Sequence, residues 1–350
     1  MQRVHGGNPP PGVIDFSTPM NPLPRPGFIG QAMGSCMEEG VVDRYYDPGM
    51  EVLREVVSGF LGVDDVYIGN GSADILSMLP LVYRPSRVIV VEPTFGDHAI
   101  QSRAWGASLY RVTMSISPRG LGHDVDHMEG LIERRSLIIL SNPNNPTGME
   151  VPREVLDAVR DLAVERESLL VVDEAFQPIS TVESYTPGEG VVVVKTLTKS
   201  LRLPGARLGI AYGDEEAIGL LEAARQPWPL DSLTHCLYTK LLSVYGERVM
   251  GYIMDGLRTS LRGAGALAGM LRGLGLRVYP TTTVYMLVEH DVEHPLLNQE
   301  LSRHGVYVRD ASSFHGLTPR HSRVSIRTMR ENMVLVEAFK RVLGGALGWG

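Results

Sequence analysis

The chain has 350 residues, of which 43% are hydrophobic and 21% charged, a composition typical of a globular protein. Its formal net charge of -7 argues against a nucleic-acid scaffold, because no general basic field would attract phosphates. The start at Met1 has no signal-peptide pattern, and no apolar stretch approaches the ~20 residues that span a bilayer. We therefore expect a cytoplasmic protein with neither nucleic-acid nor membrane partners, built from two unequal domains.

Cysteine and lysine are both rare. Cys36 and Cys236 are the only cysteines and have no metal-ligand spacing, so we expect a reducing compartment, no disulfide and no metal site. Only four of the 33 basic residues are lysines. A lysine found at a position suited to chemistry is therefore less likely to be there by chance.

In chain order, residues 1–27 are rich in proline and glycine and predict an extended N-terminal arm. Short, uniformly apolar β-branched runs then alternate with helical patterns such as 152–166, which is typical of a parallel sheet covered on both faces. We expect an α/β fold with a large domain over 28–235. The four runs are 88–91, 137–140, 169–172 and 191–194.

From residue 236 the pattern changes to two long helical stretches, apolar runs at 277–279 and 284–288, and a closing helix at 331–343. This pattern predicts a smaller α+β domain over 236–350.

Polar segments follow three consecutive predicted strands. They are 141–148 (Ser-Asn-Pro-Asn-Asn-Pro-Thr-Gly), 173–176 (Asp-Glu-Ala-Phe) and 195–199 (Lys-Thr-Leu-Thr-Lys). Ligands of open α/β sheets bind beyond the carboxyl ends of strands, so an amide, a carboxylate and an ammonium group should meet at one rim. Pyridoxal 5′-phosphate (PLP) requires this set: a lysine for the Schiff base, a carboxylate for the pyridine nitrogen and a donor for the phenolic oxygen.

A phosphate site is also predicted. Segment 69–73 (Gly-Asn-Gly-Ser-Ala) precedes an apolar helix, whose free N–H groups can bind an anion. Arg207 follows Lys199 by eight residues, and a guanidinium fork suits a phosphate. Taken singly, each segment is typical of an ordinary turn, helix cap or strand end; together, in this order, they are specific.

These motifs resemble those of the class I/II aminotransferases of PLP fold type I, over nearly the whole chain. The resemblance implies that Lys199 carries PLP, Asp173 pairs with the pyridine nitrogen, Asn145 bonds the phenolic oxygen and Phe95 stacks on the ring. It implies that Arg323 grips the substrate α-carboxylate. It implies a phosphate site made by Gly71, Ser72, Ala73, Thr196, Thr198 and Arg207.

The resemblance also implies a homodimer in which Tyr45 reaches the partner subunit's cofactor phosphate. Two subfamilies compete, threonine-phosphate decarboxylase and histidinol-phosphate aminotransferase. Four features are similar to the decarboxylase, although Val284 stands where many relatives carry asparagine. They are the start at 5–8 (His-Gly-Gly-Asn), Phe176 in place of a common tyrosine, the segment 226–228 (Gln-Pro-Trp), and Arg327 four residues after Arg323.

We therefore expect PLP-dependent decarboxylation of L-threonine O-3-phosphate to (R)-1-aminopropan-2-yl phosphate, a step of cobalamin biosynthesis. The alternative is an aminotransferase acting on histidinol phosphate or a similar amino acid. A non-catalytic PLP-fold binding protein is a remote third, since the DNA-binding segment typical of such regulators is not seen. Candidates for gripping the substrate phosphate are His5, Asn21, Arg327 and an arginine of the partner subunit.

Overall fold

The computed structural model describes residues 5–346, which contain a seven-stranded sheet with the strand order β2-β10-β9-β8-β7-β3-β4. All neighbours pair in parallel except β10, which is antiparallel to both β2 and β9. The four predicted apolar runs form four adjacent strands, β3, β7, β8 and β9, and the expected α/β fold class is confirmed. The strands are β2 (Tyr67–Gly69), β3 (Arg87–Glu92), β4 (Ser108–Thr113), β7 (Leu137–Ser141), β8 (Leu169–Asp173), β9 (Val191–Lys195) and β10 (Gly209–Gly213).

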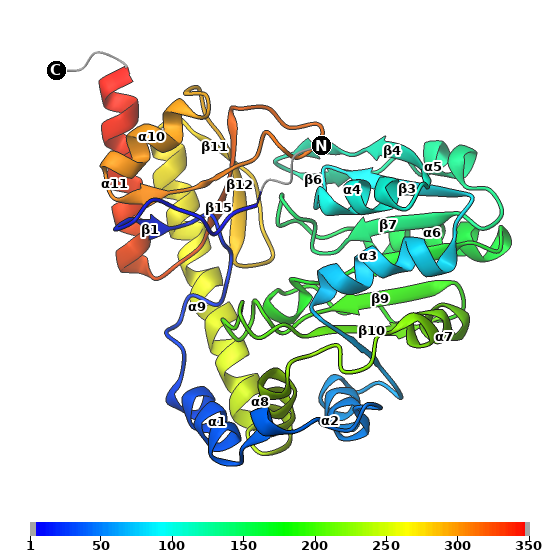
Figure 1. The fold of residues 1–350 in the computed structure, drawn as a ribbon. Helices are drawn as coiled ribbons and strands as arrows, with labels where there is room; N and C mark the ends of the chain where they lie inside the picture. Colours follow the sequence, from blue (N-terminus) through cyan, green and yellow to red (C-terminus); the bar gives the residue numbers. More distant parts are fainter. Residues whose placement is uncertain (1–4, 347–350) are drawn as a thin grey trace.

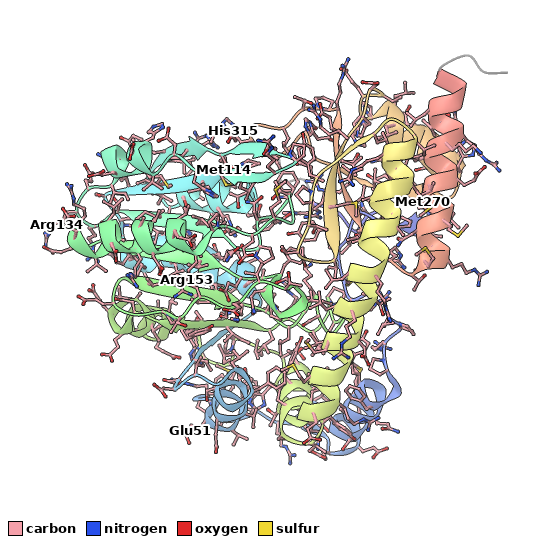
Figure 2. All side chains as sticks on the ribbon, turned by 180° about the vertical axis from the view of Figure 1, so that it is seen from behind. Glu51, Met114, Arg134, Arg153, Met270 and His315 are labelled. Atoms are coloured by element: carbon pink, nitrogen blue, oxygen red, sulfur yellow. A yellow bond between two sulfur atoms is a disulfide. The ribbon has the colours of Figure 1, made fainter. Side chains whose placement is uncertain are left out.

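Helices cover both faces of this sheet (Figure 1). Successive strand residues point to opposite faces, so Val193 packs in one apolar cluster with α6 and α8, and Val192 and Val194 pack in another with α3 and α7. Seen from behind, charged side chains such as Glu51, Arg134 and Arg153 lie on the exposed surface of the molecule (Figure 2). The helices are α1 (Gly27–Glu38), α2 (Glu51–Leu61), α3 (Ser72–Tyr83), α4 (Asp97–Ala104), α5 (Val125–Leu131), α6 (Arg153–Glu165), α7 (Glu215–Ala224) and α8 (Ser232–Ser243).

A second, antiparallel sheet has the order β11-β12-β15-β14 and packs against α9 (Gly246–Gly273), α10 (Leu296–Arg303) and α11 (Met329–Ala346). The long helix α9 joins the two parts: Ile253 belongs to the core of the large sheet and Leu267 to that of the small one. A domain boundary near 236 stays a prediction, and the change of core partner falls within α9. The remaining strands are β5 (Ser115–Ser117), β6 (Gly120–Gly122), β11 (Arg277–Val278), β12 (Tyr285–Glu289), β13 (Val306–Tyr307), β14 (Arg309–Asp310) and β15 (His321–Ser325).

The N-terminal arm bridges the two sheets. Its strand β1 (Ile14–Asp15) pairs in parallel with β13, and the Phe16 carbonyl accepts a 2.9 Å hydrogen bond from Ser325 N. Further along, Asn21 N donates to the Lys199 carbonyl at 3.0 Å. The arm therefore connects the small sheet to the segment that follows β9.

The expectation of no disulfide is wrong. Cys36 on α1 and Cys236 on α8 are bonded, with a Cα–Cα distance of 6.0 Å, although 200 residues separate them in sequence. Spacing along the chain says nothing about distance in the fold, and α1 and α8 pack side by side. The cysteines thus give no support to a reducing compartment, and the cytoplasmic location stays a prediction. No helix within residues 5–346 has the length and hydrophobicity to cross a bilayer.

Candidate active site

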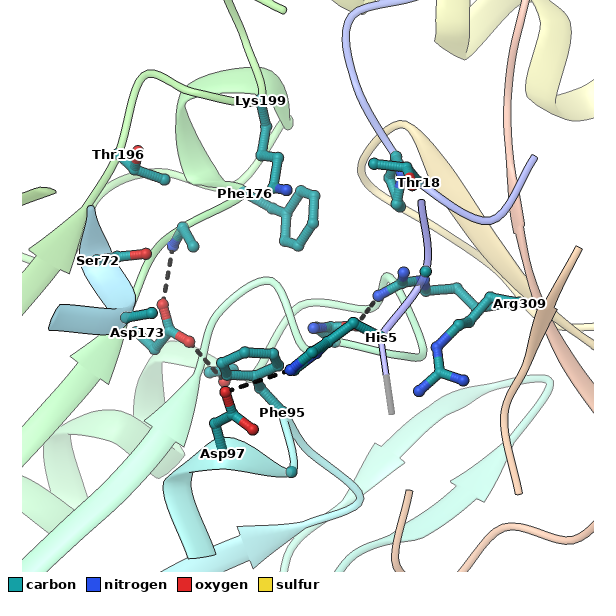
Figure 3. A pocket seen from close by; sticks show the side chains of 18 of the residues that line it. His5, Thr18, Ser72, Phe95, Asp97, Asp173, Phe176, Thr196, Lys199 and Arg309 are labelled. Atoms are coloured by element: carbon teal, nitrogen blue, oxygen red, sulfur yellow. Dashed lines mark hydrogen bonds and ion pairs between the residues drawn. The ribbon is translucent and has the colours of Figure 1, made fainter. Parts of the chain in front are cut away.

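A cavity of about 270 Å³ lies where the carboxyl ends of β7, β8 and β9 meet the arm and the small sheet. Figure 3 shows Lys199, Thr196 and Asp173 on one side of it, with Thr18 and Arg309 on the opposite side. The three predicted strand-end segments therefore converge. Of the predicted cofactor-site residues, the cavity is lined by Ser72, Ala73, Phe95, Asn145, Asp173, Thr196, Thr198, Lys199 and Arg207.

Lys199 is the lysine that faces this cavity. Its Nζ has no hydrogen-bond partner within residues 5–346, and burial, together with the nearby charges of Arg323 and Arg207, lowers its pKa to about 8. Near neutral pH a useful fraction of the amine is therefore unprotonated and nucleophilic. Lys195, four residues earlier, instead forms a buried 2.9 Å ion pair with Glu174 outside the cavity.

Asp173 ends β8, with its carboxylate fixed from two sides. Oδ1 accepts a hydrogen bond from Ala175 N at 3.1 Å, and Oδ2 lies 3.4 Å from Ser141 Oγ and 3.3 Å from His98 Nε2. His98, in the first turn of α4, is buried, and sequence reasoning missed it. The only signal was a histidine three residues after Phe95, which does not reveal contact with a strand 75 residues later.

The turn before α3 forms an anion-binding cradle with Arg207. Gly71 has a φ of 84°, and a Cβ built there would lie 2.4 Å from Arg207 Nη2, so only glycine lets the guanidinium pack against the turn. No side chain caps α3, and Arg207 forms no ion pair with any carboxylate in the described part of the chain. Gly71 borders the cavity rather than lining it, and free helix N–H groups beside a guanidinium suit a phosphate.

Arg323 on β15 lines the cavity from the side of the small sheet. Its Nη1 donates to Asn145 Oδ1 at 2.6 Å and its Nη2 to the Ser17 carbonyl at 2.9 Å, while its Nε is buried without a partner. Burial lowers its pKa to about 10. Neutral acceptors therefore hold the Arg323 guanidinium in place, and no carboxylate within residues 5–346 forms an ion pair with it.

A second guanidinium, Arg309, stands beside it and was missed by sequence reasoning. Strands β14 and β15 pair Arg309 directly with Arg323, and Arg309 lines the cavity with only 5% of its surface exposed. Its Nη2 donates to Ser313 Oγ at 2.7 Å, and burial lowers its pKa. Strand β14 has two residues and no apolar pattern, so nothing local in the sequence marks it.

The other candidate substrate residues separate into two groups. His5 lines the cavity, with Nε2 3.5 Å from Asp97 Oδ2. Asn21 is buried outside it and donates to the carbonyls of Ser200 and Tyr252, so its role is to hold the arm.

Arg327 also lies outside the cavity and is paired with Glu331 at 2.6 Å. Neither Asn21 nor Arg327 lines the cavity, since each side chain is engaged elsewhere, so the structure lends no support to a substrate contact by either residue. Tyr45 does not line the cavity either; it is 77% exposed, with its ring centroid 4.3 Å from that of Trp228.

The site fits PLP group by group. The Lys199 amine, with its lowered pKa, suits the aldehyde of PLP, and the Asp173 carboxylate at the end of β8 suits the pyridine nitrogen. The turn at Gly71, with Arg207 packed against it, suits the phosphate. Fold and site together define a PLP-dependent enzyme, which is incompatible with the remote non-catalytic alternative. The chain belongs to the class I and II aminotransferase family, whose model matches residues 27–339.

Individual relatives carry two different descriptions. A histidinol-phosphate aminotransferase from Thermoanaerobacter sp. (strain X514) is 28% identical, covering 92% of this chain and 91% of that protein. An adenosylcobalamin biosynthesis bifunctional protein CobDQ from Leptospira interrogans is 24% identical, covering 97% of this chain and 41% of that protein.

Two solved structures share the fold. The histidinol-phosphate aminotransferase from Clostridium acetobutylicum has a TM-score of 0.85 at 20% identity, covering 95% of this chain and 100% of that one. The L-threonine-O-3-phosphate decarboxylase from Porphyromonas gingivalis has a TM-score of 0.78 at 20% identity, covering 95% and 99%.

Borohydride treatment of the PLP-loaded enzyme should attach the cofactor covalently to Lys199, because this is the cavity lysine with an unpaired Nζ. Peptide mapping by mass spectrometry locates the adduct, and Lys195 in the same peptide region serves as the internal control. PLP uptake by the apoenzyme should accelerate as pH rises through about 8, since deprotonation makes the amine nucleophilic. An adduct on Lys195, or none, would contradict the assignment.

Replacing Asp173 by asparagine should lower kcat on the order of 100-fold while PLP retention changes much less. The substitution removes the charge that keeps a pyridine nitrogen protonated and leaves the phosphate cradle at Gly71 and Arg207 intact. Single-turnover rates and the PLP dissociation constant measure the two effects separately. Asp126→Asn, on the exposed face of α5, is the matched control, and a near-wild-type rate in Asp173→Asn would make Asp173 a structural cap.

Proposed function

We propose that this enzyme decarboxylates L-threonine O-3-phosphate to (R)-1-aminopropan-2-yl phosphate. The observation that carries the proposal is the pair of guanidinium groups, Arg309 and Arg323, next to each other on one wall of the cavity. The substrate has two anionic groups, a carboxylate and a phosphate, and the two guanidinium groups offer one cation to each. Arg207 stays available for the cofactor phosphate.

Two anchors decide which bond breaks. PLP, when bound, would supply an electron sink for the Cα bond that stands perpendicular to its ring. In this arrangement Arg323 binds the substrate carboxylate and Arg309 binds its phosphate. These two contacts together fix the rotation about the Cα–N bond, whereas one contact alone leaves that rotation free. Lys199 Nζ is then positioned to return a proton to Cα after CO₂ leaves. Phe176 has no hydroxyl group that could donate a hydrogen bond to the phenolic oxygen of PLP, which leaves Asn145 as the donor to that oxygen.

The P. gingivalis decarboxylase supports the proposal at the level of the fold. The CobDQ protein, of which the match covers 41%, is the relative that supports an assignment to cobalamin biosynthesis. A second candidate, an aminotransferase acting on histidinol phosphate, is favoured by the 28% identical Thermoanaerobacter relative. Histidinol phosphate carries one anionic group and an imidazole, so it uses one of the two guanidinium groups. Of these two phosphorylated amines, phosphothreonine is the one whose anionic groups match both guanidinium groups.

The product formed from phosphothreonine tests the proposal directly. The enzyme should release CO₂ and aminopropanol phosphate, and Arg309→Gln should lower kcat/KM about 10- to 100-fold, the cost of one charge-assisted hydrogen bond. The same variant should raise the fraction of cofactor lost as pyridoxamine phosphate, because the substrate gains rotational freedom. Arg327→Gln, outside the cavity, is the control and should leave kinetics nearly unchanged. Transamination of histidinol phosphate without CO₂ release from phosphothreonine would favour the second candidate instead.

We also propose a homodimer in which Tyr45 completes the partner's phosphate site. Tyr45 is strongly exposed and its loop is braced by Trp228, whose Nε1 donates to the Tyr46 carbonyl at 2.9 Å. Such an ordered, exposed aromatic side chain suits a subunit interface.

Mixing two impaired variants, Tyr45→Ala and Lys199→Ala, should restore activity if sites are shared. A hybrid dimer contains one site with both Tyr45 and Lys199 intact, so activity should appear after subunit exchange and exceed that of either variant alone. Sedimentation velocity establishes the dimer independently. A monomeric protein, or mixtures no more active than their components, would rule the arrangement out.

A further inference from the structure

A second cavity, separate from the active site, lies between the arm, the segment after Lys199 and the start of α11. It is an open groove of about 870 Å³. In Figure 1 the arm that carries β1 passes beside the N-terminal end of α11. Four arginines line this groove, against one carboxylate, Glu331, and they are Arg25, Arg202, Arg327 and Arg330.

The single carboxylate is already engaged. Glu331 Oε1 accepts from Nε and Nη2 of Arg327 at 3.0 and 2.6 Å, and its Oε2 accepts from Thr328 Oγ1 at 2.6 Å. Arg25 and Arg330 are exposed and have no hydrogen bond or ion pair within the described residues. The groove therefore keeps a local positive charge, on a chain whose net charge is -7.

Arg202 is held in the groove by the backbone rather than by a counter-charge. Its Nη1 lies 3.1 Å from the Leu23 carbonyl and 3.4 Å from that of Asn21, and its own φ is 54°, a left-handed conformation that a non-glycine side chain rarely adopts. Like charges gathered in one groove repel one another, and an anion bound among them would relieve that repulsion.

We propose that this groove binds an anion with two or more phosphate groups. Guanidinium forks match phosphate oxygens bidentately, and three of the four side chains retain N–H donors without a carboxylate partner. An adjoining groove shares Arg25 and Arg202 and is lined mainly by apolar side chains, such as Met33 and Leu203. Its one carboxylate, Asp231, accepts hydrogen bonds from Thr234 N and Oγ1 at the start of α8. The phosphates can thus come from free polyphosphate or from a nucleotide whose base lies along the apolar side.

Isothermal titration of the PLP-loaded enzyme with phosphate, pyrophosphate and ATP tests the site. Pyrophosphate and ATP should bind more tightly than phosphate, and a further gain for ATP over pyrophosphate identifies a nucleotide as the ligand. The double variant Arg25→Gln/Arg330→Gln should weaken pyrophosphate binding by about tenfold or more, since two charge-assisted contacts are lost. Both side chains lack partners, so the variant should fold and keep its PLP spectrum.

The matched control is Arg84→Gln/Arg119→Gln, which removes two charges from exposed positions that line neither groove. It should bind pyrophosphate as the unmodified enzyme does. Equal loss in both double variants would mean general attraction by net charge, and an unchanged affinity in Arg25→Gln/Arg330→Gln would mean binding at the active site. Either result, or no binding of any of the three anions, would overturn the proposal.

Discussion

The close approach of Lys199 to Arg207 and Arg323 is the constraint on which the site depends. Burial disfavours the charged form of the amine, and the nearby charges of Arg323 and Arg207 disfavour it further, so the Lys199 pKa falls to about 8. Cations held this near one another repel, and the fold must position them with neutral acceptors. For Arg323 these are the Asn145 amide oxygen and the Ser17 carbonyl. Carboxylates in their place would neutralise the guanidinium that an anion needs.

This requirement explains why the N-terminal arm runs where it does. The arm supplies the Ser17 carbonyl to Arg323, and Asn21 donates hydrogen bonds to the carbonyls of Lys199 and Ser200. A Cβ at Gly256 would lie 2.2 Å from Asn21 Oδ1, so α9 approaches the buried amide as closely as glycine allows. Asn21 therefore positions the segment that carries the lysine, although its side chain never reaches the cavity.

What could be predicted from sequence was local. Uniform apolar runs such as Val191–Val194 identify central strands because both faces of a parallel sheet are buried, and the segments after them follow by topology. Arg309, His98 and the Cys36–Cys236 bond depend instead on pairings between distant segments, which no periodicity records. Arg327 shows how far spacing alone can reach: it lies four residues after Arg323, but past the end of β15 the chain turns into α11, and Arg327 lines the other groove.

The alternation of side chains along a strand also gives two adjacent carboxylates, Asp173 and Glu174, different roles. Asp173 and Glu174 are neighbours, and because successive side chains at a strand end point to opposite sides, Asp173 faces the cavity and Glu174 faces away from it. Glu174, fully buried, is neutralised by Lys195 and also accepts from Ser184 Oγ and Tyr185 N. Such a buried pair is costly to break by removing one partner, which fixes Lys195 in a structural role. Lys199, beyond the last residue of β9, has no such partner, and its freedom from a counter-charge is what makes it the reactive lysine of the segment.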